Sequence, residues 1–236
     1  MTIKLGLPSK GRMQQDCIDW FAARGVGIER TASGREYAGA VTGVEGVELV
    51  LLSASEIPRE LAAGRIDIGV TGEDLVRETI PGWSDKIELR EKLGFGKADL
   101  IVAVPSAWID VETLHDLDAA AAAFRAAHGF RLRIATKYHS LSRAYLEKNG
   151  VADYQLVDSQ GATEATPLNL TAEAIIDITS SGETLRANHL KVLDAEPILQ
   201  SEANLCLSKI ALNDPIRKVD LLTFVRSIQP KVDLEE

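Results

Sequence analysis

The hydrophobic and polar positions of the first hundred residues switch repeatedly between short apolar runs and a period near 3.6. Apolar runs predict strands, and apolar residues spaced three or four apart predict helices. The predicted strands are 2–7, 47–52 and 67–70. The predicted helices follow PSKGR, lie within SASEIPRELAAG, and begin in TGEDLVRE. The continuous run 47–52 predicts a strand buried on both faces, and Ser55 is the expected N-cap of the second helix.

The same alternation continues to about residue 180, with two long helical segments between strands. Further strands are predicted at 100–105, 132–136, 153–157 and 174–178, and helices at 113–129 and 140–150. Strands separated by helices of this length favour a parallel α/β architecture. The tail differs, because the pattern predicts strands in 191–212 without an intervening helix, and an amphipathic helix at 214–228.

The chain has no Pro/Ser-rich hinge, so a division into two lobes must use short crossings. We expect crossings near residues 100 and 185, a topology typical of periplasmic-binding-protein-like folds. The predicted fold is α/β with two lobes of the type II form, each with a largely parallel sheet flanked by helices and the active site in the cleft between them. The first lobe is expected to contain 1–99 and 185–236, and the second 100–184.

Composition places the chain among ordinary globular proteins, with 236 residues, 45% hydrophobic and 26% charged. A net charge of −9 gives no bulk attraction to nucleic acid or an anionic membrane. Cys17 and Cys206 lie in apolar patterns and are expected to be buried, and the four histidines share no metal-ligand spacing. No apolar segment is long enough for a signal peptide or a membrane span, which predicts a cytoplasmic protein with no membrane or nucleic-acid partner.

The stretch VDSQGATEATP, 157–167, follows a predicted strand with small and hydroxyl residues. Loops after the carboxyl ends of strands bind ligands in α/β sheets. Backbone N–H groups at a helix start, with the hydroxyls of Ser159, Thr163 and Thr166, suit a phosphate group. A capped helix start uses the same residue types, and composition alone favours that alternative.

A second loop of this kind follows Asp177, where the strand AIIDI passes into TSSGET. A carboxylate at a strand end can accept hydrogen bonds from ribose hydroxyls, and phosphoribosyltransferases use similar acidic, Gly/Thr-rich loops. A plain strand-to-helix turn explains the same residues equally well. Two such loops at successive strand ends are more informative than either one.

Two further segments in the first hundred residues follow predicted strands, and they favour different interpretations. Lys10 and Arg12 flank Gly11 after the first strand, which suggests an anion site; a solvated helix start is the alternative. In VTGEDL, Thr71 and Asp74 have capping-box spacing, which favours a helix cap. Neither a G-x-S-x-G elbow nor a P-loop motif is present.

Several segments together resemble the ATP phosphoribosyltransferase family, in collinear order from about Leu5 to Leu207. They are LPSKGRM, SASEIPRELAAGRIDIGVTGEDLVRE, RIATKY, SQGATEATP and IIDITSSGETLRANHL. The chain resembles the short, catalytic-subunit form. The resemblance implies that N1 of the ATP adenine is joined to C1 of phosphoribosyl pyrophosphate (PRPP), releasing pyrophosphate with inversion in a Mg²⁺-dependent reaction that opens histidine biosynthesis.

The resemblance also implies the site residues. The PRPP residues are Asp158, Ser159, Gly161, Ala162, Thr163, Glu164, Ala165, Thr166 and Asp177, with the 5′-phosphate on Ser159 to Thr166 and the ribose hydroxyls on Asp177. The ATP residues are Lys10, Arg12, Ser53, Ala54, Thr71, Gly72, Asp74 and Lys97. The catalytic cations are Lys10, Arg12 and Arg35, of which Arg35 lies near the leaving group. Many members read PKGR where this chain has Ser9 between Pro8 and Lys10. No side chain is assigned to a metal, because pyrophosphate is expected to carry the Mg²⁺.

The implied partners are ATP and PRPP as substrates, a second catalytic chain in a homodimer, and a histidyl-tRNA-synthetase-like regulatory subunit in a hetero-oligomer. Two other functions fit the pattern. One is a solute-binding or sensor domain of the same fold, since fold does not fix function. The other is a phosphoribosyltransferase that acts on a different base.

Overall fold

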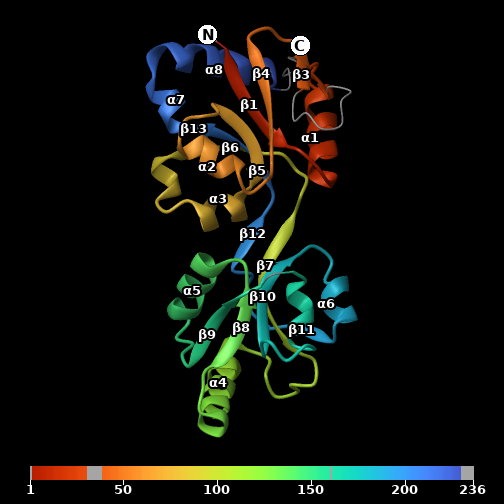
Figure 1. Cartoon of the computed structure of the whole chain (residues 1–236), viewed down its shortest axis with the longest axis vertical. Helices are drawn as coiled ribbons and strands as arrows, with labels where there is room; N and C mark the ends of the chain where they lie inside the picture. The colour runs from red at the N-terminus through yellow and green to blue at the C-terminus, as the bar shows by residue number, and fades with distance from the viewer. Residues whose placement is uncertain (1, 31–38, 160, 230–236) are drawn as a thin grey trace, which may run out of the picture. The chain divides into compact units, whose positions relative to one another are not determined.

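The computed structural model of the chain describes residues 2–30, 39–159 and 161–229. The chain forms two compact units, one from Met1–Gly96 with Glu202–Glu236 and the other from Lys97–Ser201. The two crossings run side by side, because β12 (Leu199–Ser201) pairs antiparallel with the start of β7 (Ala98–Pro105), as Figure 1 shows. Among the described residues, no helix is both long and apolar enough to cross a membrane.

The first unit is built on a mixed five-stranded sheet in the order β4-β1-β5-β13-β6. Its strands are β4 (Val47–Leu52), β1 (Ile3–Pro8), β5 (Ile68–Gly72), β13 (Ala203–Ser208) and β6 (Ile87–Lys92). β1 runs parallel to β4 and β5, whereas β13 runs antiparallel to β5 and β6. A separate hairpin is formed by β2 (Gly27–Arg30) and β3 (Gly39–Thr42).

Helices cover both faces of this sheet. One apolar cluster joins β1 to α1 (Arg12–Ala22) and α8 (Pro215–Ser227), and another joins the opposite face to α2 (Ile57–Ala62) and α3 (Glu73–Thr79). The short elements are η1 (Trp83–Asp85) and α7 (Lys209–Asn213). Cys17 and Cys206 lie in these two clusters, which confirms that they are buried. Burial raises the pKa of the Cys17 thiol to about 12, so this thiol stays protonated at neutral pH.

A buried ion pair ties α8 to the sheet. Nη2 of Arg217 lies 2.6 Å from Oδ1 of Asp67, whose side chain is 1% exposed, just before β5. The other Asp67 oxygen accepts from the backbone N–H of Lys4 at 2.8 Å, and Arg217 also donates to the carbonyl of Gly64. The buried carboxylate therefore has one charged partner and one backbone partner, as a buried charge requires.

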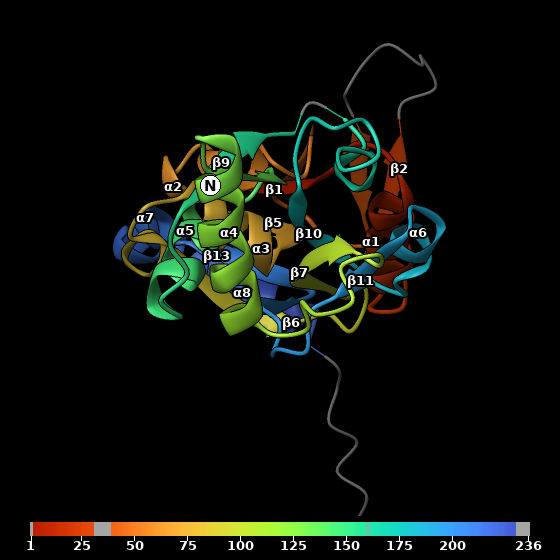
Figure 2. The ribbon, with the colours of Figure 1, turned by 90° about the horizontal axis from the view of Figure 1, so that it is seen from below.

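The second unit contains a mixed six-stranded sheet in the order β11-β7-β10-β8-β9, with β12 also on β7. The further strands are β8 (Leu132–Thr136), β9 (Tyr154–Asp158), β10 (Ala174–Thr179) and β11 (Leu190–Val192). β8 runs parallel to β9 and β10, and β7 runs antiparallel to its neighbours. In Figure 2, α4 (Leu114–His128) and α5 (His139–Lys148) lie on one side of β10, and α6 (Glu183–Ala187) lies on the other.

The fold class agrees with the α/β prediction, but three details differ. The sheets are mixed, because β7 and β13 are entered at the crossings without a helix that would return the chain in the same direction. The chain was expected to return to the first lobe near residue 185, but it stays in the second unit until Ser201, because β11 and β12 both pair with β7. Residues 47–52 form an edge strand, since β4 has a single neighbour in its sheet, and the strand packs on both faces, although Val50 and Leu52 on the second face are only partly buried.

Candidate functional site

In the second unit, three parallel strands end at one edge of the sheet. β8 lies between β9 and β10, so their carboxyl ends place Lys137, the loop after Asp158 and the loop after Asp177 beside one another. The N–H of Ser159 donates to the carbonyl of Thr136, which fixes the first loop on the end of β8. This edge is where α/β sheets bind ligands.

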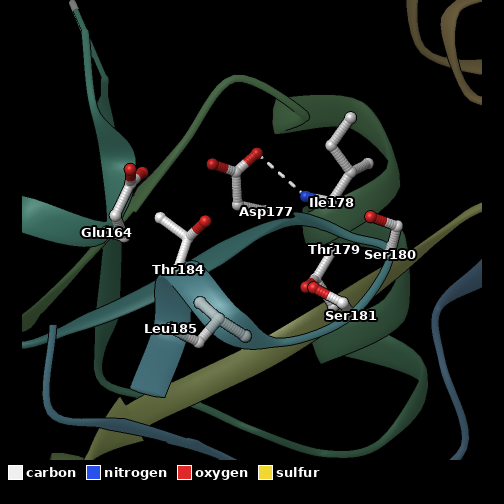
Figure 3. Close-up of a pocket in the computed structure, with 8 residues that line it drawn as sticks. All are labelled: Glu164, Asp177, Ile178, Thr179, Ser180, Ser181, Thr184 and Leu185. Carbon is white, nitrogen blue, oxygen red and sulfur yellow. Dashed lines mark hydrogen bonds between the residues drawn. The ribbon is translucent and has the colours of Figure 1, made fainter. Parts of the chain in front are cut away.

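A pocket of about 260 Å³ lies at this edge. It is lined by Glu164, Asp177, Ile178, Thr179, Ser180, Ser181, Thr184 and Leu185. Figure 3 shows the Asp177 carboxylate between Glu164 and Ile178. One Asp177 oxygen accepts from the N–H of Ile178 at 2.9 Å, which fixes the orientation of the carboxylate. Glu164 and Asp177, both predicted for PRPP, therefore line the same pocket.

The loop after Asp177 is held by its own hydrogen bonds. The N–H of Gly182 donates to Oγ1 of Thr179, and the N–H of Glu183 donates to Oγ of Ser181. Gly182 has φ 70°, a left-handed conformation that favours glycine. Among the described residues, no protein acceptor takes the hydroxyls of Ser180 and Thr184. The hydroxyls of Ser180 and Thr184 therefore remain open at the pocket.

The hydroxyls of the other loop are engaged within the protein. Oγ of Ser159 and Oγ1 of Thr163 lie 2.7 Å apart, and both side chains are buried. The Thr166 hydroxyl donates to the carbonyl of Thr163. The helix expected after Gly161 is a single 3₁₀ turn, η2 (Thr163–Ala165). None of these three hydroxyl residues is among those that line this pocket.

Backbone N–H groups of this loop lack an acceptor in the part of the chain that the structure describes, whereas its hydroxyl groups bond within the protein. Within the described residues, no acceptor takes the N–H groups of Ala162, Thr163 and Glu164. Gly161 is not in a left-handed conformation, and a Cβ added there would meet nothing within 4 Å beyond its chain neighbours. The carbonyl of Gly161 accepts from Nζ of Lys137 at 2.7 Å.

The sequence analysis named the loop TSSGET as a candidate for ribose and phosphate, but it assigned only Asp177 of this segment to PRPP, and it did not assign Lys137. The five polar residues of TSSGET begin two positions after Asp177, so their position was available in the sequence. Lys137 reaches the loop only because β8 and β9 are neighbours. A second contact joins the same segments, since Nε2 of His139 lies 3.4 Å from Oδ1 of Asp158.

In the first unit, the predicted ATP residues follow three parallel strands, β4, β1 and β5. Oγ1 of Thr71 donates to the carbonyl of Ala54 at 2.9 Å, and the N–H of Ser9 donates to the carbonyl of Leu52. The segments of Lys10, of Ser53 with Ala54, and of Thr71 with Gly72 therefore lie at one sheet edge. Asp74 is buried at the start of α3.

The expected helix caps in this unit are wrong. The Thr71 hydroxyl bonds to Ala54 across the sheet edge, so it does not cap α3, whose N-cap is Gly72. Ser55 does not cap α2, since the N-cap is Glu56, and the Glu56 carboxylate accepts from both the N–H and the hydroxyl of Ser53. These hydrogen bonds hold the pKa of Glu56 below its ordinary value.

The predicted cations are solvent-exposed. The Arg12 side chain is 93% exposed, with Nε 3.8 Å from Oδ2 of Asp16, and Lys10 and Lys97 are also exposed. Lys97 is the first residue of the second unit. Arg35 lies outside the described residues. Within those residues, no group of three His, Cys, Asp or Glu side chains is arranged to hold a metal ion.

Known proteins that are similar to this chain include members of one enzyme family and structures of one fold. The sequence profile of HisG, ATP phosphoribosyltransferase, matches residues 53–229. The chain is 68% identical over 211 residues to an ATP phosphoribosyltransferase of Cereibacter sphaeroides, covering 89% of each chain. It is 51% identical over 210 residues to another from a Chelativorans species, covering 89% of this chain and 91% of the relative.

Solved structures share the fold. The ATP phosphoribosyl transferase (HisG:HisZ) complex from Thermotoga maritima contains a chain with a TM-score of 0.73 at 21% identity, covering 97% of both chains. A mutant of the arginine-binding protein ArgBP from the same organism has a TM-score of 0.52 at 14% identity, covering 96% of this chain and 87% of that one. The type II periplasmic-binding-protein-like fold is thus the architecture of this chain.

Proposed function

Because the chain belongs to the ATP phosphoribosyltransferase family, we propose that its second unit binds PRPP and its first unit binds ATP. The chain transfers a phosphoribosyl group to ATP, the first step of histidine biosynthesis. The observation that supports this placement of PRPP is the pocket in Figure 3, where a fixed carboxylate lies next to a preorganised loop of hydroxyl groups.

The PRPP ribose hydroxyls would donate to the Asp177 carboxylate, and the 5′-phosphate would accept from the hydroxyls of Ser180 and Thr184. The loop Asp158–Thr166 would contribute backbone N–H groups from Ala162 to Glu164, while Ser159, Thr163 and Thr166 hold its shape. In this proposal the 5′-phosphate lies closer to the loop after Asp177 than the family resemblance implies. The reason is that the open hydroxyls lie in that loop, whereas those of the first loop bond within the protein.

ATP would be bound by the residues that cluster at the sheet edge of the first unit, including Ser53, Ala54, Thr71, Gly72 and Asp74. Lys10 and Arg12 are exposed there, so their side chains can approach phosphate oxygens, with Lys97 and Arg35 as further cations in the proposal. Adenine N1 is unprotonated at neutral pH, so the attack on C1 needs no strong general base. The cations would instead stabilise the charge that develops on the leaving pyrophosphate.

Magnesium fits the same proposal. Hard cations prefer oxygen ligands, and Glu164 and Asp177 are the carboxylates at the pocket. Since the described residues contain no three-ligand cluster, most ligands would come from the phosphate oxygens of the substrate. A bound Mg²⁺ supplies positive charge to the pyrophosphate as it leaves. The chain's own contribution is to hold the ribose and align C1 with adenine N1.

The proposed assembly is a homodimer of catalytic chains that joins a histidyl-tRNA-synthetase-like regulatory subunit in the cytoplasm. The similar Thermotoga maritima structure is itself a HisG:HisZ complex. The decisive experiment mixes the chain with ATP, PRPP and Mg²⁺, with and without such a subunit, and follows the nucleotide adduct and pyrophosphate. Amino-acid binding without transfer in either mixture would instead favour a solute-binding domain.

Gly161→Val should weaken PRPP binding, with a smaller loss of ATP binding. A Cβ at this position meets no protein atom within 4 Å beyond its chain neighbours, so we expect the added side chain to obstruct a ligand that approaches the backbone N–H groups. Calorimetric titration with PRPP and with ATP measures both affinities. Thr184→Val is the matched change in the other loop. Comparing the loss of PRPP affinity in the two variants shows which loop contributes more to PRPP binding. Unchanged PRPP affinity in Gly161→Val would show that the loop Asp158–Thr166 does not bind PRPP.

Lys137→Met should raise the KM for PRPP by roughly three- to tenfold, the range for losing one exposed charge-assisted hydrogen bond. The methionine keeps the aliphatic stem but removes the donor to the Gly161 carbonyl. Steady-state kinetics with PRPP varied and ATP saturating gives the value. Lys137→Arg should recover part of the affinity, and Lys148→Met, at the far end of α5, should leave it unchanged. If Lys137→Met and Lys148→Met change the KM for PRPP equally, Lys137 has no role in holding the loop.

A further inference from the structure

A second pocket of the second unit lies at the opposite end of β9 from the PRPP loop. Its volume is about 430 Å³, and its lining comes from α5, the residue before β8, and the start of β9. The lining residues are Arg131, Arg143, Ala152, Asp153, Tyr154, Gln155 and Leu156. None of them lines the pocket in Figure 3. Nothing in the proposed transfer reaction uses this pocket.

The charges at this pocket are unbalanced. Asp153 is the single carboxylate of the lining, and its oxygen already accepts from Nη1 of Arg125. Arg131 and Arg143 form no ion pair or hydrogen bond with any part of the chain that the structure describes. Arg143 has Glu147 one turn further along α5, yet the two do not pair. Two uncompensated guanidinium groups therefore face one pocket.

Most of the other described arginines lie next to a carboxylate, although Arg24, Arg59, Arg186 and Arg226 do not. Seven other arginines have a carboxylate within ion-pair distance: Arg12, Arg65, Arg77, Arg90, Arg125, Arg133 and Arg217. The whole chain has a net charge of −9, so an acidic side chain is the common neighbour of a cation. Two guanidinium groups that share a pocket without such a neighbour create a local positive potential, which attracts an anion.

The rest of the lining suits a bound molecule. Tyr154 and Leu156 are half-buried against the apolar core, so they form a firm wall beside the arginines. Gln155 is exposed and carries both a donor and an acceptor. β9 is at the end of the strand order and pairs with β8 alone among the described strands, so its outer backbone groups are open as well.

We propose that this pocket binds a small molecule that carries a phosphate group, with Arg131 and Arg143 as its ligands. The guanidinium fork pairs with phosphate oxygens through two parallel N–H bonds, and two forks match the double charge of a phosphate better than a single carboxylate. The proposal is independent of the transfer activity, because it rests on residues outside the PRPP and ATP sites.

The test is a ¹H–¹⁵N NMR titration with inorganic phosphate at constant ionic strength. Binding at this pocket should give saturable shifts of the backbone amides of 152–156. Shifts of the amides of 177–185 report binding at the pocket in Figure 3, so the two sites are read separately. Arg131→Gln with Arg143→Gln should weaken the phosphate affinity reported by 152–156 about a hundredfold, because each of the two charge-assisted interactions contributes close to a factor of ten. The shifts of 177–185 should not change.

Lys148→Gln with Arg226→Gln is the matched control, since it removes the same charge from exposed positions outside the lining. It should leave the phosphate affinity at 152–156 as in the wild type. The two single arginine variants are measured as well, so that the result does not depend on the double variant folding. The proposal would be overturned if the amides of 152–156 show no saturable shifts. It would also be overturned if the shifts persist in the double arginine variant, or if the control variant loses as much phosphate affinity as that variant. A titration with succinate that gives the tighter binding would overturn the assignment to phosphate.

Discussion

Replacement of Asp177 by asparagine should lower kcat/KM for PRPP by about a hundredfold or more, because two ribose hydroxyls would each lose a charge-assisted hydrogen bond. Asparagine has the same shape, and its carbonyl oxygen can still accept from the N–H of Ile178. The fold should therefore be unchanged while the charge at the pocket is lost. Steady-state kinetics with PRPP varied measures the effect, and the KM for ATP should change far less.

Asp194→Asn is the matched control, since Asp194 is an exposed carboxylate of the same unit outside the pocket. Its kinetics should equal those of the wild type. A kcat/KM for PRPP within a few-fold of the wild type in Asp177→Asn would mean that the ribose is held elsewhere. The placement of PRPP in the pocket of Figure 3 would then be wrong, although the family assignment would stand.

Arg217→Met should lower the free energy of unfolding by about 3–5 kcal/mol, the usual cost of leaving a buried charge without its partner. The Asp67 carboxylate is 1% exposed and would retain only the N–H of Lys4 as a donor. Denaturant titration of the wild type and the variant gives the difference directly.

Arg226→Met, an exposed position on the same helix, should change the free energy of unfolding by less than about 0.5 kcal/mol. The double variant Asp67→Leu with Arg217→Met removes both charges and should recover much of the lost stability, since buried pairs are replaced by apolar residues at little cost. A loss below about 1 kcal/mol in Arg217→Met would show that water reaches Asp67.

The elements that the sequence predicted best are those with local end signals. The helix expected at 113–129 is α4, where Thr113 and Asp116 form a capping box and Gly129 is left-handed. The helix expected at 214–228 is α8, which the Asp214 side chain caps through the N–H groups of Ile216 and Arg217. Each signal lies within a few residues of the helix end, so it can be recognised without the fold.

Features that depend on contacts between distant segments were missed. The Thr71 hydroxyl has a capping position within reach, but it donates to Ala54, 17 residues earlier, because β4 and β5 flank β1. β6 was not indicated because its charged residues, as in IELREK, suit an edge strand and obscure the pattern. At the candidate site, Asp177 follows from the strand pattern, whereas Lys137 requires knowing which strands are neighbours.

The position of β13 makes folding follow a different order from synthesis. Residues 97–201 are continuous, and all strands of the second sheet lie within them. The first sheet, in contrast, has β13 between β5 and β6, so its centre stays incomplete until residue 208 has left the ribosome. Domains fold as units during synthesis once their chain is available. Residues 97–201 can therefore fold first, whereas the N-terminal strands can complete their sheet only after β13 has been synthesised.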